Sequence, residues 1–163
     1  MTHVVVLSDT HIRRGGTRRL PHPAYAHLES ADLILHAGDV LVPEFLDELR
    51  GFAPLHAVLG NNDVELVGVL PEILQLEIDG LRVGMIHDSG PTAGRSGRMH
   101  RRFPDCDLVI YGHSHVPWDT QGLDGQVLFN PGSPTDRRAQ PDHTLGTLDI
   151  DDGRLVARRI HMV

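Results

Sequence analysis

Short apolar runs alternate along the chain with polar or amphipathic stretches, and this alternation predicts most of the secondary structure. In the first half, the apolar runs His3–Leu7, Leu33–His36 and Leu55–Leu59 predict strands, because each is short and bounded by polar or turn-forming residues. Helices are predicted over Pro23–Ser30 and Pro43–Leu49, the second with proline in its first turn. Strands that alternate with helices favour a parallel or mixed sheet covered by helices.

The second half of the chain is richer in predicted strands. Two runs flank Asp79-Gly80, a dipeptide that favours a hairpin turn. The predicted strands are Ile73–Ile78, Leu81–Ile86, Leu108–Tyr111, Val127–Asn130, Thr144–Ile150 and Leu155–Ile160, and a short helix is predicted over Ser96–Arg102. No repeat, low-complexity segment or linker interrupts the 163 residues, so residues 1–163 are expected to form a single domain.

Side chains that can bind metal ions follow five of the predicted strands. The segments are Asp9-Thr10-His11, Gly38-Asp39, Gly60-Asn61-Asn62-Asp63, His87 and Gly112-His113-Ser114-His115. In an open α/β sheet, ligands bind where the carboxyl ends of the strands meet at one edge. The sequence therefore predicts a site for two metal ions at the edge of a sheet.

The spacing and chemistry of these residues refine the prediction. In extended backbone, residues i and i+2 point the same way, so the Asp-x-His and His-x-His pairs each offer two ligands to one side. Two metal ions roughly 3.5–4 Å apart need a bridging carboxylate, and Asp39 is the candidate because a glycine before it allows close approach. Aspartate, histidine and asparagine ligands without thiolate suit manganese, iron, nickel, cobalt or zinc, of which manganese is favoured.

As an ordered set, these motifs resemble the signature of the calcineurin-like metallophosphoesterase superfamily, and in particular its small single-domain phosphodiesterase branch. The resemblance covers nearly the whole chain and includes Asn130-Pro131-Gly132-Ser133, which is similar to a loop of the small members. It implies an α/β protein with mixed sheets, arranged as a four-layer α/β/β/α sandwich with two divalent metal ions at the sheet edge.

The resemblance also implies a role for each ligand. One metal ion would be bound by Asp9, His11 and His115, the other by Asn61, His87 and His113, with Asp39 as the bridge. The residues expected to act in catalysis are Asp39, Asn61 and His87, with Asp63 in a supporting position. The implied reaction is hydrolysis of a phosphoester, most simply a phosphodiester, by a hydroxide that bridges the two ions.

Two positions depart from the family pattern. The residue after the metal-binding asparagine is usually a histidine that looks like the general acid, but here it is Asn62, which does not readily donate a proton. Without a general acid, esters with poor leaving groups react more slowly by ~10²–10⁴, so diesters with good leaving groups are the expected substrates. Asp88 stands where many relatives have glycine; it is interpreted as a neighbour of the ligands or a turn residue, with a proton donor as the alternative.

Charge and composition limit the partners that we expect. The formal net charge of -7 disfavours general nucleic-acid binding, which usually needs a basic surface. No apolar run is long enough for a membrane span and no signal-peptide pattern begins the chain, so a cytoplasmic location is expected. A small phosphoester is the expected partner, and the oligomeric state is left open, with a homo-oligomer as one option. The arginines of the loop after His11 either contact this substrate or are solvated: Arg13, Arg14, Arg18 and Arg19.

Two other classes of function remain as alternatives. Some proteins of this fold, such as the retromer scaffold subunit, resemble the family but bind proteins, and such members typically lose metal ligands. All seven ligand positions carry suitable side chains here, which favours an enzyme over a scaffold. A regulatory module would bind metal and nucleotide without turnover, and Asn62 in place of the histidine keeps that alternative open.

Overall fold

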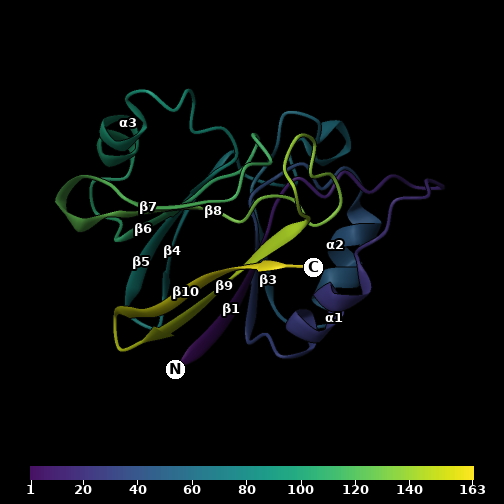
Figure 1. The fold of residues 1–163 in the computed structure, drawn as a ribbon, viewed down its shortest axis with the longest axis horizontal. Helices are drawn as coiled ribbons and strands as arrows, with labels where there is room; N and C mark the ends of the chain where they lie inside the picture. The colour runs from purple at the N-terminus through teal and green to yellow at the C-terminus, as the bar shows by residue number, and fades with distance from the viewer.

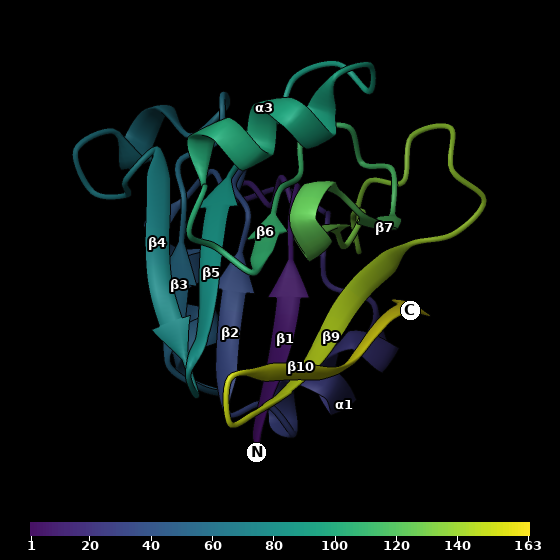
Figure 2. The same cartoon turned by 90° about the vertical axis from the view of Figure 1, so that its left-hand side faces the viewer.

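Two mixed five-stranded sheets pack face to face in the computed structural model, which describes residues 1–163 (Figures 1 and 2). The first sheet has the order β10-β9-β1-β2-β3 and is made of β1 (Thr2–Leu7), β2 (Leu33–His36), β3 (Leu55–Ala57), β9 (Thr144–Asp151) and β10 (Arg154–Met162). The second has the order β4-β5-β6-β8-β7 and is made of β4 (Ile73–Ile78), β5 (Leu81–Ile86), β6 (Leu108–Ile110), β7 (Trp118–Gln121) and β8 (Val127–Asn130).

Helices cover the outer face of each sheet (Figure 1). The α-helices are α1 (His22–Glu29) and α2 (Pro43–Arg50), which cover the first sheet, and α3 (Arg95–Arg102), which covers the second. Two short 3-10 helices are η1 (Val64–Leu66) and η2 (Leu123–Gly125). None of these helices combines the length and the apolar character that crossing a membrane would require. The implied four-layer α/β/β/α sandwich is therefore confirmed.

Side-chain alternation along β1 shows how the layers are held together. Val4 and Val6 point between the sheets, where they pack in one cluster with residues of the second sheet such as Met85. Val5 and Leu7 point the other way and pack against α1 and α2. Because both faces of β1 are buried, its sequence is a continuous apolar run, as expected for a central strand covered on both sides.

Most predicted elements are confirmed, with small differences at their ends. The predicted strand Leu55–Leu59 stops at Ala57, because the chain turns there toward the loop that holds Gly60 and Asp63. The Asp79-Gly80 turn is confirmed, with both residues at positive φ between antiparallel β4 and β5. Strand β7 was not predicted, because Trp118–Gln121 is a largely exposed edge strand without an apolar run.

The parallel strands of both sheets deliver their following loops to one edge of the molecule. In the first sheet β1, β2 and β3 are parallel, and in the second β5, β6 and β8 are parallel. Backbone hydrogen bonds join the loops beyond these strands, including Asp9 N–H to Gly38 C=O at 2.9 Å and Gly112 N–H to His87 C=O at 3.0 Å. The segments that carry the predicted ligands therefore meet at this edge.

Candidate metal centre

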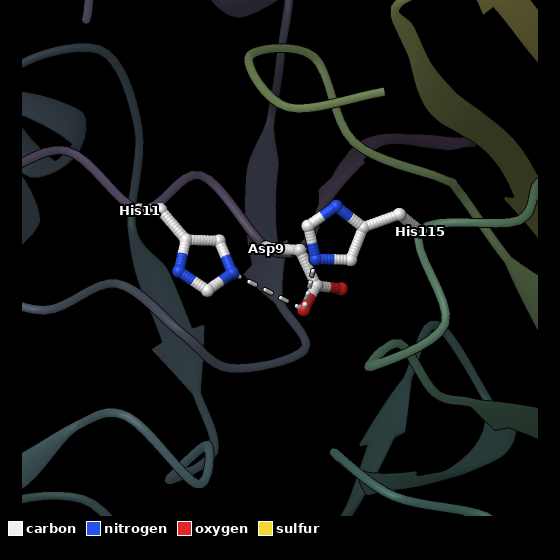
Figure 3. A group of neighbouring side chains, drawn as sticks. All are labelled: Asp9, His11 and His115. Atoms are coloured by element: carbon white, nitrogen blue, oxygen red, sulfur yellow. Dashed lines mark ion pairs between the residues drawn. The ribbon is translucent and has the colours of Figure 1, made fainter. Parts of the chain in front are cut away.

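Asp9, His11 and His115 form a first group of potential ligands, with the aspartate carboxylate between the two imidazole rings (Figure 3). Oδ1 of Asp9 lies 3.8 Å from Nε2 of His11 and 3.4 Å from Nε2 of His115. All three atoms are buried and none has a hydrogen-bond partner in the protein. Buried polar atoms are rarely left unpaired in proteins. These three atoms converge and can each offer a lone pair, so together they fit a bound cation.

Asp9, Asp39 and His87 form a second group of potential ligands beside the first. Nε2 of His87 lies 3.3 Å from Oδ2 of Asp39 and 3.8 Å from Oδ1 of Asp9. Oδ1 of Asn61 lies 2.9 Å from Nε2 of His87 and 3.1 Å from Nδ1 of His113. The structure thus brings together side chains from the ends of all five strands that the sequence singled out.

Two carboxylates lie between the groups. Oδ2 of Asp39 is 3.4 Å from Nε2 of His11 and 3.3 Å from Nε2 of His87, so it reaches one histidine of each predicted triad. Asp9, which the sequence assigned to one ion, also faces both histidines, at 3.8 Å from each. Asp39 therefore lies between the two groups, and its bridging role stays a prediction.

Hydrogen bonds to backbone carbonyls orient two of the histidines. Nδ1 of His87 donates to the carbonyl of Ala37 at 2.7 Å, and Nδ1 of His115 donates to the carbonyl of Asp136. A carbonyl oxygen only accepts, so Nδ1 of each ring carries a proton and Nε2 is the atom that faces the site.

The charges of the site are set by contacts among its own residues. Burial alone would raise the pKa of Asp39, but the hydrogen bond and charge of His87, with hydrogen bonds from Asn62, lower it well below its ordinary value. Burial opposes protonation of His87, yet Asp39 and Asp9 raise its pKa to about 9. A positive charge is thus stabilised at this position, and a metal ion would displace the proton of His87.

The backbone is in the left-handed region at most of the proposed ligands. Five of the ten non-glycine residues at positive φ belong to the ligand set: Asp9 at 55°, His11 at 46°, Asp39 at 61°, His113 at 71° and His115 at 61°. Such a conformation is uncommon for residues with a Cβ, and clustering of strain is typical of functional sites. The backbone is therefore strained at these residues, in a conformation that directs their side chains into the site.

Glycines of the motifs leave room for the ligands. A Cβ on Gly60 would lie 2.2 Å from both the backbone nitrogen and Oδ1 of Asp39. A Cβ on Gly38 would lie 2.6 Å from Nδ1 of His87, and one on Gly112 would lie 2.7 Å from Oδ2 of Asp9. These glycines are needed because backbone and ligand side chains approach closely.

Asp63 supports the site and does not face the ligands. Its buried carboxylate accepts hydrogen bonds from the backbone nitrogens of Asp39 at 2.9 Å, Leu41 at 2.8 Å and Gly60 at 2.7 Å. These bonds join the Asp39 loop to the Asn61 loop. These contacts position the Asp39 loop, and a role of Asp63 in catalysis stays a prediction.

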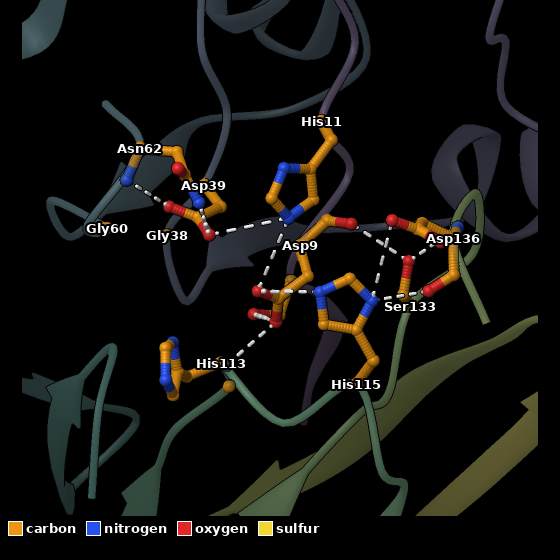
Figure 4. A network of polar contacts seen from close by, with 12 residues as sticks. Asp9, His11, Gly38, Asp39, Gly60, Asn62, His113, His115, Ser133 and Asp136 are labelled. Atoms are coloured by element: carbon orange, nitrogen blue, oxygen red, sulfur yellow. Dashed lines mark hydrogen bonds and ion pairs between the residues drawn. The ribbon is translucent and has the colours of Figure 1, made fainter. Parts of the chain in front are cut away.

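Asn62, which replaces the usual histidine, contacts the predicted bridging carboxylate (Figure 4). Its backbone N–H donates to Oδ1 of Asp39 and its side-chain Nδ2 donates to Oδ2, both at 2.9 Å. The side chain therefore fixes the orientation of the Asp39 carboxylate.

His36 is a supporting residue that the sequence analysis missed. It ends β2, is fully buried, and accepts a hydrogen bond at Nδ1 from the backbone nitrogen of Gly38 at 3.1 Å. Nε2 therefore carries the proton and faces Oγ1 of Thr10 at 3.0 Å. Burial lowers the pKa of His36 to about 3, so this neutral form persists at neutral pH. Its position within an apolar run was the only signal in the sequence.

The loop after β8 braces the site from the second sheet (Figure 4). Oγ of Ser133 donates to the carbonyl of Asp9 at 2.8 Å and accepts from the backbone nitrogen of Asp136 at 2.8 Å. Nδ2 of Asn130 donates to the carbonyl of Gly112 at 3.2 Å. This gives a physical role to the Asn-Pro-Gly-Ser segment, which the sequence analysis noted only as a resemblance.

Asp88 combines two of the three roles considered for it. Its Oδ1 accepts a hydrogen bond from the backbone nitrogen of Gly90 at 2.8 Å, which closes a turn. Its Oδ2 lies 3.9 Å from Nε2 of His113 and is exposed to solvent. Asp88 is therefore both a turn residue and a neighbour of a proposed ligand.

Most arginines of the loop after β1 are engaged by the protein itself. Arg14 donates to both carboxylate oxygens of Glu44, at 2.9 and 2.8 Å, and also reaches Glu65. Arg18 donates to the carbonyl of His11 at 3.3 Å, and Arg19 donates to backbone carbonyls of its own loop. Arg13 makes none of these contacts and is exposed. The structure thus favours a structural role for Arg14 and Arg19.

The fold and the donor set define a metallophosphoesterase, and comparison with known proteins supports that class. Residues 1–153 match the calcineurin-like phosphoesterase superfamily domain. A probable metallophosphoesterase of Methanothermobacter thermautotrophicus is 36% identical over 159 residues, which cover 95% of this chain and 90% of that protein. A probable metallophosphoesterase of Mycoplasma pneumoniae is 32% identical over 171 residues, covering 99% and 98%. The chain belongs to the calcineurin-like phosphoesterase superfamily.

Solved structures share the same fold. Wild-type Vps29 of Entamoeba histolytica, complexed with zinc, matches with a TM-score of 0.79 and 23% identity over 99% of this chain and 98% of that one. A structure described as a novel archaeal phosphodiesterase matches with a TM-score of 0.72 and 21% identity over 99% of both chains. Identities this low establish a common fold and leave the activity to be argued from the site.

Proposed function

We propose that the protein is a metal-dependent phosphodiesterase whose site holds two divalent metal ions, with manganese as the favoured metal. The observation that carries the proposal is the set of buried, unpaired donors: Oδ1 of Asp9, Nε2 of His11 and Nε2 of His115. Membership of the superfamily and the resemblance to probable metallophosphoesterases support it. One ion would be held by Asp9, His11 and His115, the other by Asn61, His87 and His113, with Asp39 shared. When bound, the ions would neutralise charge on phosphoryl oxygens and lower the pKa of water.

The protein's own residues would bind and orient the reacting groups. Asp39 is held by Asn62 and by the Asp63-supported loop, so its carboxylate enters the reaction already oriented. Two of the proposed ligands leave the site accessible to a substrate: His113, whose side chain is 42% exposed, and Asn61, which is also exposed. A small phosphoester can therefore reach the centre of an otherwise acidic protein.

The side chain at position 62 favours diesters with good leaving groups as substrates. Nδ2 of Asn62 already donates to Asp39, and an amide does not serve as a general acid. We expect bis(p-nitrophenyl) phosphate to be hydrolysed faster than methyl phosphate in the presence of manganese, by ~10²–10⁴, the range that a general acid contributes. Faster release of phosphate from methyl phosphate would contradict this preference.

The principal experiment compares the wild type with Asp39→Asn for metal content and diesterase activity. We expect about two manganese ions per wild-type chain, and loss of both metal and turnover in Asp39→Asn, because the neutral amide is a poor bridge between two cations. Asp47→Asn on α2, an exposed aspartate that pairs with Arg50, is the matched control and should behave as wild type.

The same measurements separate the other classes of function. Metal without turnover of any diester would favour a regulatory binding module. A protein without metal would favour a protein-interaction scaffold. The structural neighbours named Vps29 leave room for such a non-catalytic use of the fold. A cytoplasmic location and a single domain stay predictions of the sequence, and a homo-oligomer stays one option.

A further inference from the structure

A cavity of about 440 Å³ opens beside the second group of ligands. His87 and Asn61 form part of its wall, so the cavity is continuous with the proposed metal centre. The apolar wall of the cavity consists of the five hydrophobic residues of its lining: Leu59, Val64, Val67, Ile73 and Ile86. Its volume lies in the range of small-molecule sites, which begins at about 300 Å³.

The apolar wall contains side chains that the fold itself leaves exposed. Val64 is 80% exposed, Val67 is 69% exposed and Ile73 is 38% exposed. Three of the nine large hydrophobic residues that the protein exposes therefore line this one cavity. Leu66, between the two valines, is fully buried and anchors η1, so the turn presents Val64 and Val67 outward. Clustered exposed apolar side chains beside polar ligands are typical of a ligand site.

The lining of the cavity also includes a free guanidinium. Arg102 ends α3, is exposed, and makes no hydrogen bond or ion pair in the structure, whereas Arg95 and Arg98 of the same helix are tied to Ser89. A planar guanidinium stacks on aromatic faces.

Glu72 and Asp88 also line the cavity, and their carboxylates disfavour a further anionic group on the ligand. An apolar wall, an unpaired guanidinium and these carboxylates together select an uncharged planar ring. They do not select a second phosphate.

We propose that this cavity binds one organic arm of the phosphodiester, and that this arm is an aromatic or heteroaromatic ring such as an aryl group or a nucleobase. The proposal rests on the proposed function, because a phosphoryl group at His87 and Asn61 directs one of its ester arms into the cavity. The ring packs on Val64 and Val67 and is covered by Arg102.

The test measures equilibrium binding of two phosphate monoesters to the manganese-loaded protein by calorimetry. Phenyl phosphate and methyl phosphate carry the same phosphate group, so the difference between their affinities measures the contribution of the organic arm. We expect phenyl phosphate to bind at least about tenfold more tightly, because the cavity removes the ring from water. In Val64→Ser combined with Val67→Ser, most of this advantage should vanish while the affinity for methyl phosphate stays unchanged.

The matched control variants change residues that lie close in the sequence to the cavity residues. Val69→Ser removes an equally apolar, 64% exposed side chain that does not line the cavity, and it should keep the phenyl advantage. Hexyl phosphate separates a ring from an apolar chain of the same carbon number. Arg102→Ala should weaken phenyl phosphate and leave hexyl phosphate unchanged, whereas Arg101→Ala, which alters an exposed neighbour outside this cavity, should affect neither.

Several outcomes would overturn the assignment. These are equal affinity of the wild type for the phenyl and methyl esters, no binding of either, equally tight binding of hexyl phosphate, or the same loss in Val69→Ser. A phenyl preference without turnover of any diester would refute the proposed function and leave the cavity assignment intact. Turnover without a phenyl preference would refute only the cavity assignment.

Discussion

Asn62 shows how a single side chain can change both the geometry and the chemistry of a site. It replaces a proton donor with an amide, and the structure shows that the amide donates to Oδ2 of Asp39 at 2.9 Å. The carboxylate that is proposed to bridge two cations therefore has a fixed orientation. The amide that stands in place of the expected general acid thus supports a proposed ligand.

We expect Asn62→Ala to weaken manganese binding by about 10- to 100-fold, the usual effect of removing a hydrogen bond to a metal ligand. The backbone N–H of residue 62 would still donate to Oδ1 of Asp39, so the site should not collapse. A manganese titration against a fluorescent chelator measures the effect. Unchanged manganese affinity would show that the Asn62 amide does not support Asp39.

Asn62→His tests the other consequence of the same position. An imidazole there offers a proton to the leaving group, so hydrolysis of alkyl esters should rise by ~10² or more relative to hydrolysis of aryl esters. The ratio of the two rates is the measurement, because it is insensitive to the fraction of metal-loaded protein. If this ratio were the same in Asn62→His and in the wild type, the missing general acid would not be the cause of the leaving-group preference.

At the scale of elements, the loops beyond β2 and β3 meet so closely that only glycine fits at position 60. In Gly60→Ala, the new Cβ would lie 2.2 Å from Asp39, and the backbone there must move. We expect loss of manganese binding and a lower free energy of unfolding, by about 1–3 kcal/mol as in other overpacked sites. Gly97→Ala inside α3 is the control, since its Cβ meets only the flexible end of Arg101 and alanine favours a helix. Normal metal binding by Gly60→Ala would contradict the close approach.

The end of β2 makes the fold sensitive to acid. His36 has a pKa of about 3 in the folded protein because it is buried, against about 6.5 in the unfolded chain. Between these values the unfolded chain binds one more proton, so the contribution of His36 to stability is complete above pH 6.5 and is lost as the pH falls toward 3.

From pH 7 to pH 5, the free energy of unfolding should therefore fall by about 2 kcal/mol more in the wild type than in His36→Gln. Urea unfolding of the metal-free proteins at the two pH values gives this difference. His56→Gln, at an exposed position of β3, is the control and should keep the wild-type pH dependence. Parallel loss of stability in wild type and His36→Gln would refute this role of His36.

At the scale of the whole molecule, the proposed metal centre joins the two sheets. Asp9, Asp39 and Asn61 follow strands of the first sheet, whereas His87, His113 and His115 follow strands of the second. The unfolded chain does not bring these side chains together, so metal binding should stabilise the packed sheets.

Manganese at 100 times its dissociation constant should raise the free energy of unfolding by about 2.7 kcal/mol for each ion bound, and a chelator should remove this gain. Asp39→Asn should show no such gain, and Asp47→Asn should show the full gain. Urea unfolding with and without manganese provides the measurement. Equal stabilisation of Asp39→Asn would mean that manganese binds elsewhere on the protein.

Much of this arrangement was predictable from sequence, because its signals are local. Apolar runs such as Val4–Leu7 predict central strands, and turn residues such as Asp79-Gly80 predict hairpins. Ligand-type side chains directly after those strands indicated where a site would form. The roles of individual ligands came from a resemblance between ordered motifs, which is also a property of the sequence.

Other features of the site depend on contacts between segments that are distant in the sequence. Only the tertiary structure decided these features. No local pattern shows that His36 faces Oγ1 of Thr10, that Ser133 binds the carbonyl of Asp9, or that Asn62 donates to Asp39. The same holds for the cavity where η1 meets the end of α3, since Val64 and Arg102 are far apart in the chain. The sequence determined which side chains follow each strand, because that depends on neighbours along the chain. Only the packing of two sheets decided which of those side chains face one another, because that depends on distances through space.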